Sequence, residues 1–448
     1  SYIFVKIKTS FICMKLRFLF VFAGLLCWSL SHSQSYKPID TADNALRKEK
    51  VLRFEQKSKE YVAGLKDRYS NKISSKIGTD FKEFTQDFCE EINEGSFVFD
   101  KKMNDYVIGI LNQLRENNNN IPNDIDILIA RNNTLNAFCI PNNTFVLNMG
   151  LFYWLENEEQ VAAVISHELG HRILEHTTKN KKKAVEDASS SQTKQDIKSI
   201  ALTKYGKYDY AFNLFKSKLY LSREAERKQE FEADSLGYEI YRKSKYAQSE
   251  FLTALGMMAR YDTIKPKGVK VEIYKSVFNL PNLPFDEKWL LKEDFSKYNY
   301  DLFKEKIDRD SISSHPETLN RISRIKELFP ETTSKTKTEA TASFKEISQI
   351  AEMEMVPNLY KKERYGDAIY LCLLFLQTEN RHQDYYKKWL GHCFMKVYEG
   401  RKNYKLNRYL DRIEPKNQSE SYQQFLNFVW NLKLDEIKAI ADYYSKET

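Results

Sequence analysis

Apolar residues along the chain follow two spacings, and each spacing predicts a kind of element. Isoleucine occupies every second position from Ile125 to Ile129, which is typical of a β-strand. Residues 137–140 and 145–148 predict the two strands of a hairpin. The turn between them, Pro141-Asn-Asn-Thr144, suits a hairpin because asparagine tolerates the left-handed backbone that a tight turn requires.

Helical spacing of apolar residues predominates in the rest of the chain. It predicts helices within a charged arm at 34–75, from Phe81 to Arg115, from Glu158 past His176, from Ser222 onward, and throughout 344–448. Polar composition predicts a surface loop at Lys179–Lys194 and a linker over 331–343. The expected fold class is therefore α+β, mostly α.

Composition narrows this picture. The chain has 448 residues, of which 42% are apolar, and it holds 28 Tyr and 28 Phe, so it can bury a large core spread over two or three domains. Only 14 Gly and 10 Pro are present, which excludes fibrous repeats and favours long helices. The net charge is +8, of which residues 1–33 contribute +4, and the remainder is too mild for a nucleic-acid binder.

The first 33 residues have the pattern of a secretory signal peptide. A basic start from Met14 to Arg17 precedes an apolar run over 18–30, and small residues follow at Ser31 and Ser33. A membrane anchor is the alternative, but a spanning helix needs about 20 apolar residues. We expect an upstream extension at 1–13, cleavage near Ser33, and an exported protein with no transmembrane helix afterwards, in the periplasm or outside the cell.

Four cysteines follow residue 33, and an exported compartment permits disulfides between them. Cys372 and Cys393 lie close in sequence on neighbouring predicted helices, so they are the favoured pair. The alternative is that all four, including Cys89 and Cys139, are buried thiols.

The segment from His167 to His171 reads His-Glu-Leu-Gly-His, the HExxH pattern of zinc enzymes. Residues i and i+4 share a helix face, so both imidazoles can reach one metal ion. Glu168 lies beside the first histidine, where it can accept a proton from a bound water. Gly170 costs about 1 kcal/mol inside a helix, which indicates close packing or room for a ligand. The alternative is two surface histidines on a charged helix.

Two histidines leave a zinc ion short of a third protein ligand, and Glu230 is the best candidate. Glu230 and Asp234 share a helix face, so one carboxylate can bind zinc while the other accepts a hydrogen bond from a ligand imidazole. The alternative is that both are simply solvated. Glu232 points elsewhere on the helix and is expected to be a bystander. His176, five residues beyond His171, is expected at the surface.

Four motifs in order resemble metallopeptidase family forty-eight, over about residues 76–330. They are Asn136-Ala-Phe-Cys-Ile-Pro-Asn-Asn-Thr-Phe-Val-Leu-Asn-Met-Gly-Leu151 with Glu156-Asn-Glu-Glu159, then Ser166-His-Glu-Leu-Gly-His171, then Glu230 to Asp234, and Ser314-His-Pro316 with Arg321. The chain departs from the family in having Asn142-Asn143 where a Gly-rich turn is usual. It lacks the membrane helices of the prenyl endopeptidase branch, so it resembles the exported, soluble branch.

The resemblance implies a gluzincin metallopeptidase domain over 76–330, with a small β-sheet beside the active-site helix and one Zn²⁺ per chain. His167, His171 and Glu230 would bind the zinc, Glu168 would be the base, and Asp234 would hydrogen-bond to a ligand.

The resemblance also implies residues that contact the substrate. The strand Phe145-Val146-Leu147-Asn148 would be the sheet edge to which an extended polypeptide substrate adds as a further strand. Asn136 would hold the substrate backbone or cap the turn. His315 would approach the metal or the developing oxyanion, with an ordinary loop position as the alternative.

The carboxyl-terminal segment, 344–448, is expected to form a separate helical domain. Tyr365-Gly-Asp-Ala-Ile-Tyr370 followed by Trp389-Leu-Gly-His-Cys393 resembles one tetratricopeptide unit, a helix pair that offers a groove to a protein partner. A generic helical bundle is the alternative, because stacked repeats normally number about three or more.

Two functions follow from these observations. The first is a zinc-dependent endopeptidase that cleaves exported or misfolded envelope proteins. The second is a non-proteolytic chaperone or assembly scaffold with a structural or gated zinc. A structural zinc normally has four protein ligands, and only three are visible here unless His315 is a fourth. The intact Glu168 also favours catalysis.

Overall fold

A computed structural model describes residues 36–40, 42–191, 195, 207–261, 268–292, 318–334, 338–378, 382–414 and 418–446; over 207–223 it describes the backbone alone. The expected signal peptide and His315 lie outside the described residues. The elements that build the domain around the sheet are α2 (Asn44–Arg68), α3 (Asn71–Asn93), β1 (Phe97–Val98), α4 (Lys101–Arg115), β2 (Asp126–Ala130), β3 (Ala137–Ile140), β4 (Thr144–Asn148), α5 (Gly150–Trp154), α6 (Glu158–Ile173), α7 (His176–Ser189), α9 (Lys207–Tyr241), α10 (Ser249–Tyr261), α12 (Thr318–Leu328) and η4 (Pro330–Thr333).

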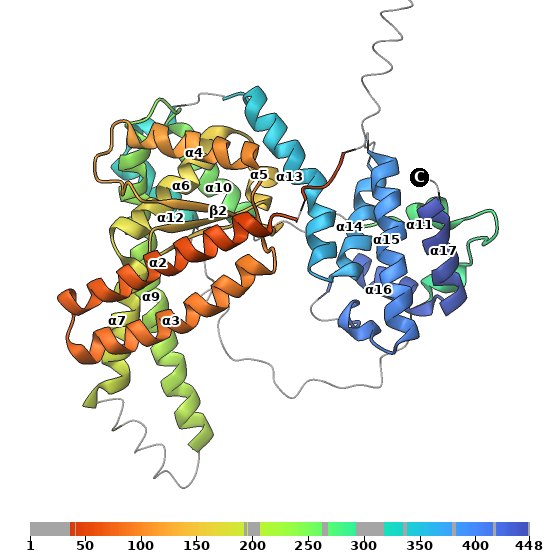
Figure 1. Cartoon of the computed structure of the whole chain (residues 1–448), viewed down its shortest axis with the longest axis horizontal. Helices are drawn as coiled ribbons and strands as arrows, with labels where there is room; N and C mark the ends of the chain where they lie inside the picture. Colours follow the sequence, from red (N-terminus) through yellow and green to blue (C-terminus); the bar gives the residue numbers. More distant parts are fainter. Residues whose placement is uncertain are drawn as a thin grey trace, which may run out of the picture.

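A second group of helices lies beside them (Figure 1). It comprises α11 (Val271–Phe278), η1 (Glu287–Leu290), α13 (Ala342–Lys361), α14 (Tyr365–Leu376), α15 (Gln383–Lys402), η5 (Leu406–Arg408), α16 (Glu420–Asn431) and α17 (Leu434–Lys446). The predicted α+β fold, mostly α, is confirmed. Among the described residues, none of the helices combines the length and apolar character needed to cross a membrane.

The sheet has four strands in the order β1-β2-β4-β3. β2 pairs with β4 in parallel, while β1 and β3 pair antiparallel with β2 and β4. The predicted hairpin forms, and its turn holds Asn143 at φ 64°, the left-handed backbone that asparagine tolerates. The neighbouring Asn142 side chain accepts a hydrogen bond from the backbone N–H of Thr144 at 3.2 Å.

The expectation that Phe145-Val146-Leu147-Asn148 forms the sheet edge is wrong. These residues belong to β4, which lies between β2 and β3, and all of them are buried. A continuous apolar run is typical of a strand covered on both faces, whereas an edge strand has one side free. In the described part of the chain, the sheet has two edge strands, β1 and β3, and β3 is the one beside β4.

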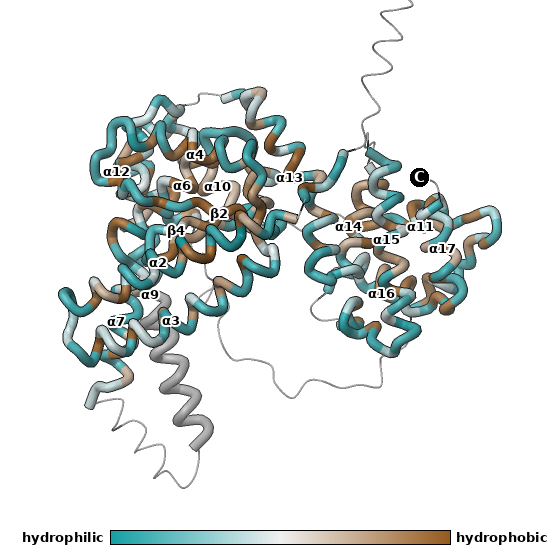
Figure 2. The backbone as a smooth tube through the Cα atoms, in the orientation of Figure 1, coloured by the Kyte–Doolittle hydropathy of each residue, from teal (hydrophilic) through white to brown (hydrophobic). Residues whose placement is uncertain are grey.

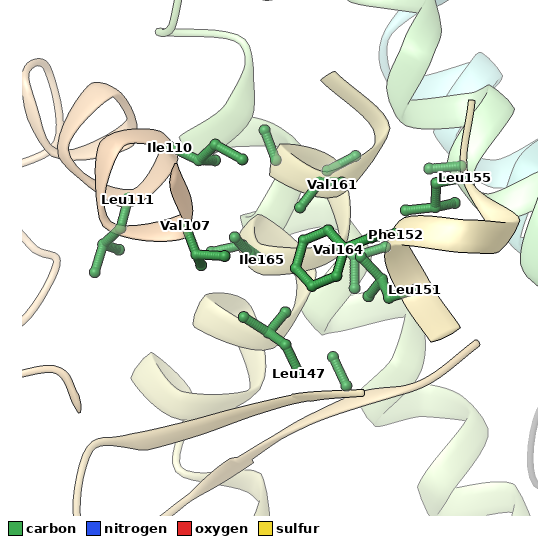
Figure 3. Packing of buried hydrophobic residues seen from close by; sticks show 14 of the residues in the cluster. Val107, Ile110, Leu111, Leu147, Leu151, Phe152, Leu155, Val161, Val164 and Ile165 are labelled. Atoms are coloured by element: carbon green, nitrogen blue, oxygen red, sulfur yellow. The ribbon is translucent and has the colours of Figure 1, made fainter. Parts of the chain in front are cut away.

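Helices cover both faces of the sheet. On one face, Phe54 of α2 and Phe81 of α3 pack in a cluster with Ile140 and Val146. On the other face, α4, α5 and α6 pack around Leu147. Figure 3 shows their apolar side chains converging there: Val107, Ile110, Leu111, Leu151, Phe152, Val161, Val164 and Ile165. α6 is thereby held at the centre of the larger core, and Figure 2 shows apolar positions gathered around α6, α10 and β2.

Helix α13 joins the two groups. Phe344 and Ile347 in its first half pack into the core around the sheet, whereas Met355 and Val356 in its second half pack with the carboxyl-terminal helices. Those helices also enclose residues 268–292, where Phe278 contacts Phe394 and Phe428. This segment was expected within the 76–330 domain, but its aromatic side chains pack with the second core. The domain boundaries themselves stay a prediction.

Several predicted boundaries differ from the structure. Between Phe81 and Arg115 the helix is interrupted at Gly95, whose φ is 78°, and strand β1 follows. The helix from Glu158 breaks at Glu175, whose φ is 55°. The expected loop from Lys179 is instead the helix α7, because a polar sequence can form an exposed helix.

The predicted repeat and the favoured disulfide both fall in the carboxyl-terminal helices. The two segments that resemble a tetratricopeptide unit lie on α14 and α15, which pack against each other. The structure also packs α15 against α17, so the repeat and the generic bundle both stay open. Cys372 and Cys393 carry free thiols, as do Cys89 and Cys139, so the favoured disulfide is not formed in the described chain.

Candidate metal centre

The active-site helix α6 has a well-defined start. Its N-cap Asn157 accepts a hydrogen bond from the backbone N–H of Gln160 at 3.0 Å. Glu158 and Glu159 occupy the first turn, where their negative charges interact favourably with the helix dipole. The apolar run 161–165 is buried in the core. The register set by this cap and this run places His167 at the edge of the core, 4% exposed.

α6 and α9 approach each other unusually closely at two glycines. A Cβ added to Gly170 would lie 2.5 Å from the carbonyl oxygen of Ala233, and one added to Gly237 would lie 2.9 Å from the Cα of His167. Both helices therefore need glycine at the contact. The sequence-based expectation of close packing at Gly170 is confirmed, and this contact brings the carboxylates of α9 to the histidines of α6.

Three candidate ligands converge as the sequence predicts. His171 Nε2 lies 3.1 Å from His167 Nε2 and 3.2 Å from a carboxylate oxygen of Glu230, and His167 Nε2 lies 3.6 Å from the other oxygen. With bonds of about 2.0–2.1 Å, a tetrahedral zinc ion separates neighbouring donors by roughly 3.3–3.4 Å. Two histidines and one carboxylate are also a donor set of catalytic zinc sites. These residues therefore fit a zinc ion.

Asp234 lies where it can orient the first ligand. One of its oxygens lies 2.8 Å from Nδ1 of His167, and this close negative charge favours a proton on Nδ1, which leaves Nε2 free for a metal. Burial lowers the pKa of His167, but Asp234 and Glu230 outweigh burial, and that pKa lies above its ordinary value. The predicted placement of Asp234 beside a ligand imidazole agrees with this geometry.

Arg321 of α12 holds both carboxylates in place. It donates to Asp234 through Nε at 2.6 Å and Nη2 at 2.7 Å, and its Nη1 lies 2.9 Å from Glu230. Burial would raise the pKa of each carboxyl, but Arg321 and the histidines outweigh burial and hold the pKa of Asp234 and of Glu230 below its ordinary value. From the sequence, Arg321 could be recognised only as part of a motif, and its contacts with Glu230 and Asp234 of α9 show its role.

Glu168 lies next to the candidate ligands on α6. It is partly buried, and its charge adds to burial in raising the pKa of the Cys139 thiol on β3. Burial raises the pKa of Glu168, although the neighbouring His171 and His167 oppose that effect. A carboxylate with an elevated pKa beside a metal site is suited to accept and return a proton.

The expectation that His176 lies at the surface is wrong, whereas Glu232 lies outside the three candidate ligands, as expected. His176 is 3% exposed, and its Nδ1 lies 2.9 Å from Nδ1 of His171, while its Nε2 lies 3.2 Å from a carboxylate oxygen of Glu232. Burial and His171 lower the pKa of His176 to about 4. The predicted surface position of His176 assumed a helix that continues past it. The break at Glu175 redirects the chain and brings His176 back to His171.

Two further candidate residues are Asn136 and His315. Asn136 is exposed directly before β3, and its carbonyl oxygen accepts a hydrogen bond from the backbone N–H of Asn148 at 3.0 Å. A contact of Asn136 with substrate stays a prediction. His315 lies outside the described residues, and so do Ser314 and Pro316.

An apolar cavity of ≈ 370 Å³ lies between β3 and the helices around it. Its walls come from α2, α3, β3 and the start of α7, and its lining residues include Tyr61, Ile77, Phe81, Phe84, Phe138, Ile140 and Lys181. Cys139, Pro141 and Thr177 line both this cavity and a small depression that reaches His171. The cavity therefore lies next to the metal centre.

Comparisons with known proteins agree with this geometry. Residues 102–329, about half of the chain, match peptidase family M48. A segment of 79 residues, 18% of the chain, is 28% identical to a β-barrel assembly-enhancing protease of Yersinia pestis, of which it covers 16%. A segment of 112 residues, 25% of the chain, is 30% identical to the mitochondrial metalloendopeptidase OMA1 of Arabidopsis thaliana, of which it covers 21%. The chain thus spans about a fifth of these curated relatives.

Proposed function

The chain belongs to peptidase family M48, and on that premise we propose that it is a zinc-dependent endopeptidase. One observation carries the proposal: the donor atoms of His167, His171 and Glu230 lie 3.1–3.6 Å apart, with Glu168 beside them. Zinc at such a site polarises a carbonyl group and lowers the pKa of water to about 7.

The chain's own residues supply the proton transfer and the positioning. Glu168 accepts a proton as the nucleophile forms and returns it to the leaving amine. Asp234 and Arg321 keep His167 and Glu230 in the orientation that binds the metal. The glycine contact between α6 and α9 keeps the two halves of the site together.

The substrate is proposed to add as a strand to β3. Asn148 N–H bonds to Asn136 O, so the bonded pairs of this hairpin alternate from that point. The backbone groups of Ala137 and Cys139 then face away from β4, toward the free side. A strand placed there extends past Glu168 and presents every second side chain to the apolar cavity. The cavity suits a large apolar side chain.

The place of action is proposed from two observations. The first 33 residues have the pattern of a signal peptide, and one relative is named a β-barrel assembly-enhancing protease. We therefore propose an exported enzyme that cleaves misfolded or unassembled envelope proteins. The carboxyl-terminal helices are the proposed contact for a protein partner. Tyr404, two residues after α15, is 98% exposed there.

The decisive experiment pairs zinc content with cleavage of casein in the wild-type chain and in Glu168→Gln. We expect one zinc per chain in both, and a loss of cleavage of about 10²–10⁴-fold in the variant because the proton acceptor is gone. Zinc in both without cleavage in either would favour the scaffold function. In that case His315→Ala would test whether His315 keeps the enzyme latent. Absence of zinc from both would overturn the site.

A further inference from the structure

A chain of polar contacts extends from His171 away from the other candidate ligands. Nδ1 of His171 lies 2.9 Å from Nδ1 of His176, and Nε2 of His176 lies 3.2 Å from a carboxylate oxygen of Glu232. His176 is 3% exposed, whereas the Glu232 side chain is 45% exposed and reaches solvent. The contacts therefore connect a partly buried candidate ligand, His171, to a solvated carboxylate through one buried imidazole.

One arrangement of protons satisfies all these contacts. Nε2 of His171 faces His167 and Glu230, so it must carry a lone pair if it binds a metal. Nδ1 of His171 then carries the proton and donates to Nδ1 of His176. A neutral imidazole has one donor and one acceptor nitrogen, so Nε2 of His176 is protonated and donates to Glu232.

We propose that His176 and Glu232 are positioning residues for the metal centre, which fix the tautomer and the ring orientation of His171. Asp234 does the same for His167 by direct contact at 2.8 Å. Both histidine ligands are thus connected to a carboxylate, directly in one case and through an imidazole in the other. This inference rests on the zinc site of the proposed function but not on peptide hydrolysis.

The fold holds His176 in this position from several sides. Glu175, at φ 55°, separates α6 from α7 and sets the direction of the chain. α2 packs on this corner: Arg68 pairs with Glu175, and the Tyr61 hydroxyl lies 2.9 Å from the Thr178 hydroxyl. α2 precedes the segment that matches the peptidase family. The amino-terminal helices therefore support the metal centre from outside that segment.

The test measures zinc affinity of the metal-stripped full chain by competition with a chelator. His176→Phe keeps a ring of similar shape but removes the acceptor, and we expect zinc to bind about 10–100-fold more weakly. Glu232→Gln should weaken binding less, because its amide oxygen can still accept from His176. His392→Phe is the matched control: it removes a histidine from α15 and should leave the affinity unchanged.

A second readout separates positioning from a loss of folding. His176→Gln can accept from His171 and donate to Glu232, so it should restore zinc affinity to within a few fold of the wild type. With Co²⁺ in place of zinc, we expect the visible absorption bands to change in His176→Phe and not in His392→Phe, because the ligand orientation changes only in the former.

Four outcomes decide the inference. Equal zinc affinity and equal Co²⁺ spectra in wild type and His176→Phe would overturn it, and so would a wild type that binds no zinc. Two zinc ions per wild-type chain, reduced to one in His176→Phe without a change at the tighter site, would make His176 a ligand of a second ion instead. Zinc binding that depends on His176, without casein cleavage, would support the inference and contradict the proposed function.

Discussion

Arg321 is 2% exposed and contacts two carboxylates, so its charge is balanced entirely within the metal centre. Removing one partner of a buried ion pair leaves an unbalanced charge and costs about 3–5 kcal/mol. We expect Arg321→Met to lower the free energy of unfolding of the metal-free chain by about that amount. Urea denaturation in the presence of a chelator measures it.

The same helix offers a control for this variant. Arg324 pairs with Glu327 at 3.7 Å on the surface of α12, with both side chains more than half exposed. Exposed pairs contribute about 0–1 kcal/mol, so Arg324→Met should change stability little. Similar losses of unfolding free energy in both variants would mean that α12 is destabilised by any loss of charge. The ion pairs of Arg321 in the metal centre would then not be the cause.

The site residues that share one helix face could be predicted from the sequence, and those joined by long-range contacts could not. His167 and His171 are four residues apart on α6, as Glu230 and Asp234 are on α9, so periodicity alone aligns each pair. The position of His176 depends instead on a backbone break at Glu175. Since glutamate rarely adopts positive φ, no local signal predicts that break.

At the scale of elements, the contact between α6 and α9 decides whether the ligands meet. A Cβ at position 170 would lie 2.5 Å from a carbonyl oxygen of α9, so one helix must shift. We expect Gly170→Ala to lower the free energy of unfolding by about 1–3 kcal/mol and to weaken zinc binding. Thermal unfolding and chelator competition measure the two effects.

Gly64 is the matched control because it lies inside helix α2 and a Cβ there would meet no atom within 4 Å. Gly64→Ala should stabilise the chain by about 0.5–1 kcal/mol, as alanine is the better helix former. If Gly170→Ala were also stabilising, the close approach of α6 and α9 would not be needed.

The apolar cavity gives a prediction about substrate preference. Phe84 of α3 lines the cavity and is 37% exposed, so truncating it enlarges the cavity without a large loss of core. We expect Phe84→Ala to lower kcat/KM about 10-fold for peptides with a large apolar side chain at one position, and to spare peptides with a small one.

A peptide series measures this preference, with Leu52→Ala as the control. Leu52 is an apolar residue of α2 that is 66% exposed and does not line the cavity. An equal loss for every peptide in Phe84→Ala would assign the effect to folding of α3 and not to recognition of a side chain.

The types of the elements could be predicted well from the sequence, whereas the order in which the strands pair could not. Alternation and turn chemistry predict the strands and the hairpin, because both are local. The order β1-β2-β4-β3 depends on the parallel pairing of β2 with β4. This pairing is not local, because β3 lies between the two strands in the sequence. The edge on the hairpin side of the sheet was therefore assigned to Phe145–Asn148 when it belongs to Ala137–Ile140.

At the scale of the whole molecule, a buried charge joins three distant segments. Glu354 of α13 is fully buried and pairs with Arg131, which follows β2, at 3.1 Å. It also accepts hydrogen bonds from the Tyr36 hydroxyl at 2.8 Å and the Ile39 backbone N–H at 2.7 Å. These contacts tie residues 36–40 and the sheet to the helix that both cores share. No spacing in the sequence relates the three segments.

A double-mutant cycle tests whether this cluster holds the two cores together. Arg131→Met and Glu354→Met should each lower the free energy of unfolding by about 3–5 kcal/mol, because each leaves the other charge buried without its partner. The double variant should lose clearly less than the two losses combined, since neither charge then remains. It should still be less stable than the wild type, because the Ile39 N–H and the Tyr36 hydroxyl lose their acceptor. Additive losses in urea denaturation would mean that Arg131 and Glu354 act independently, and the cluster would then be no connection between the sheet and α13.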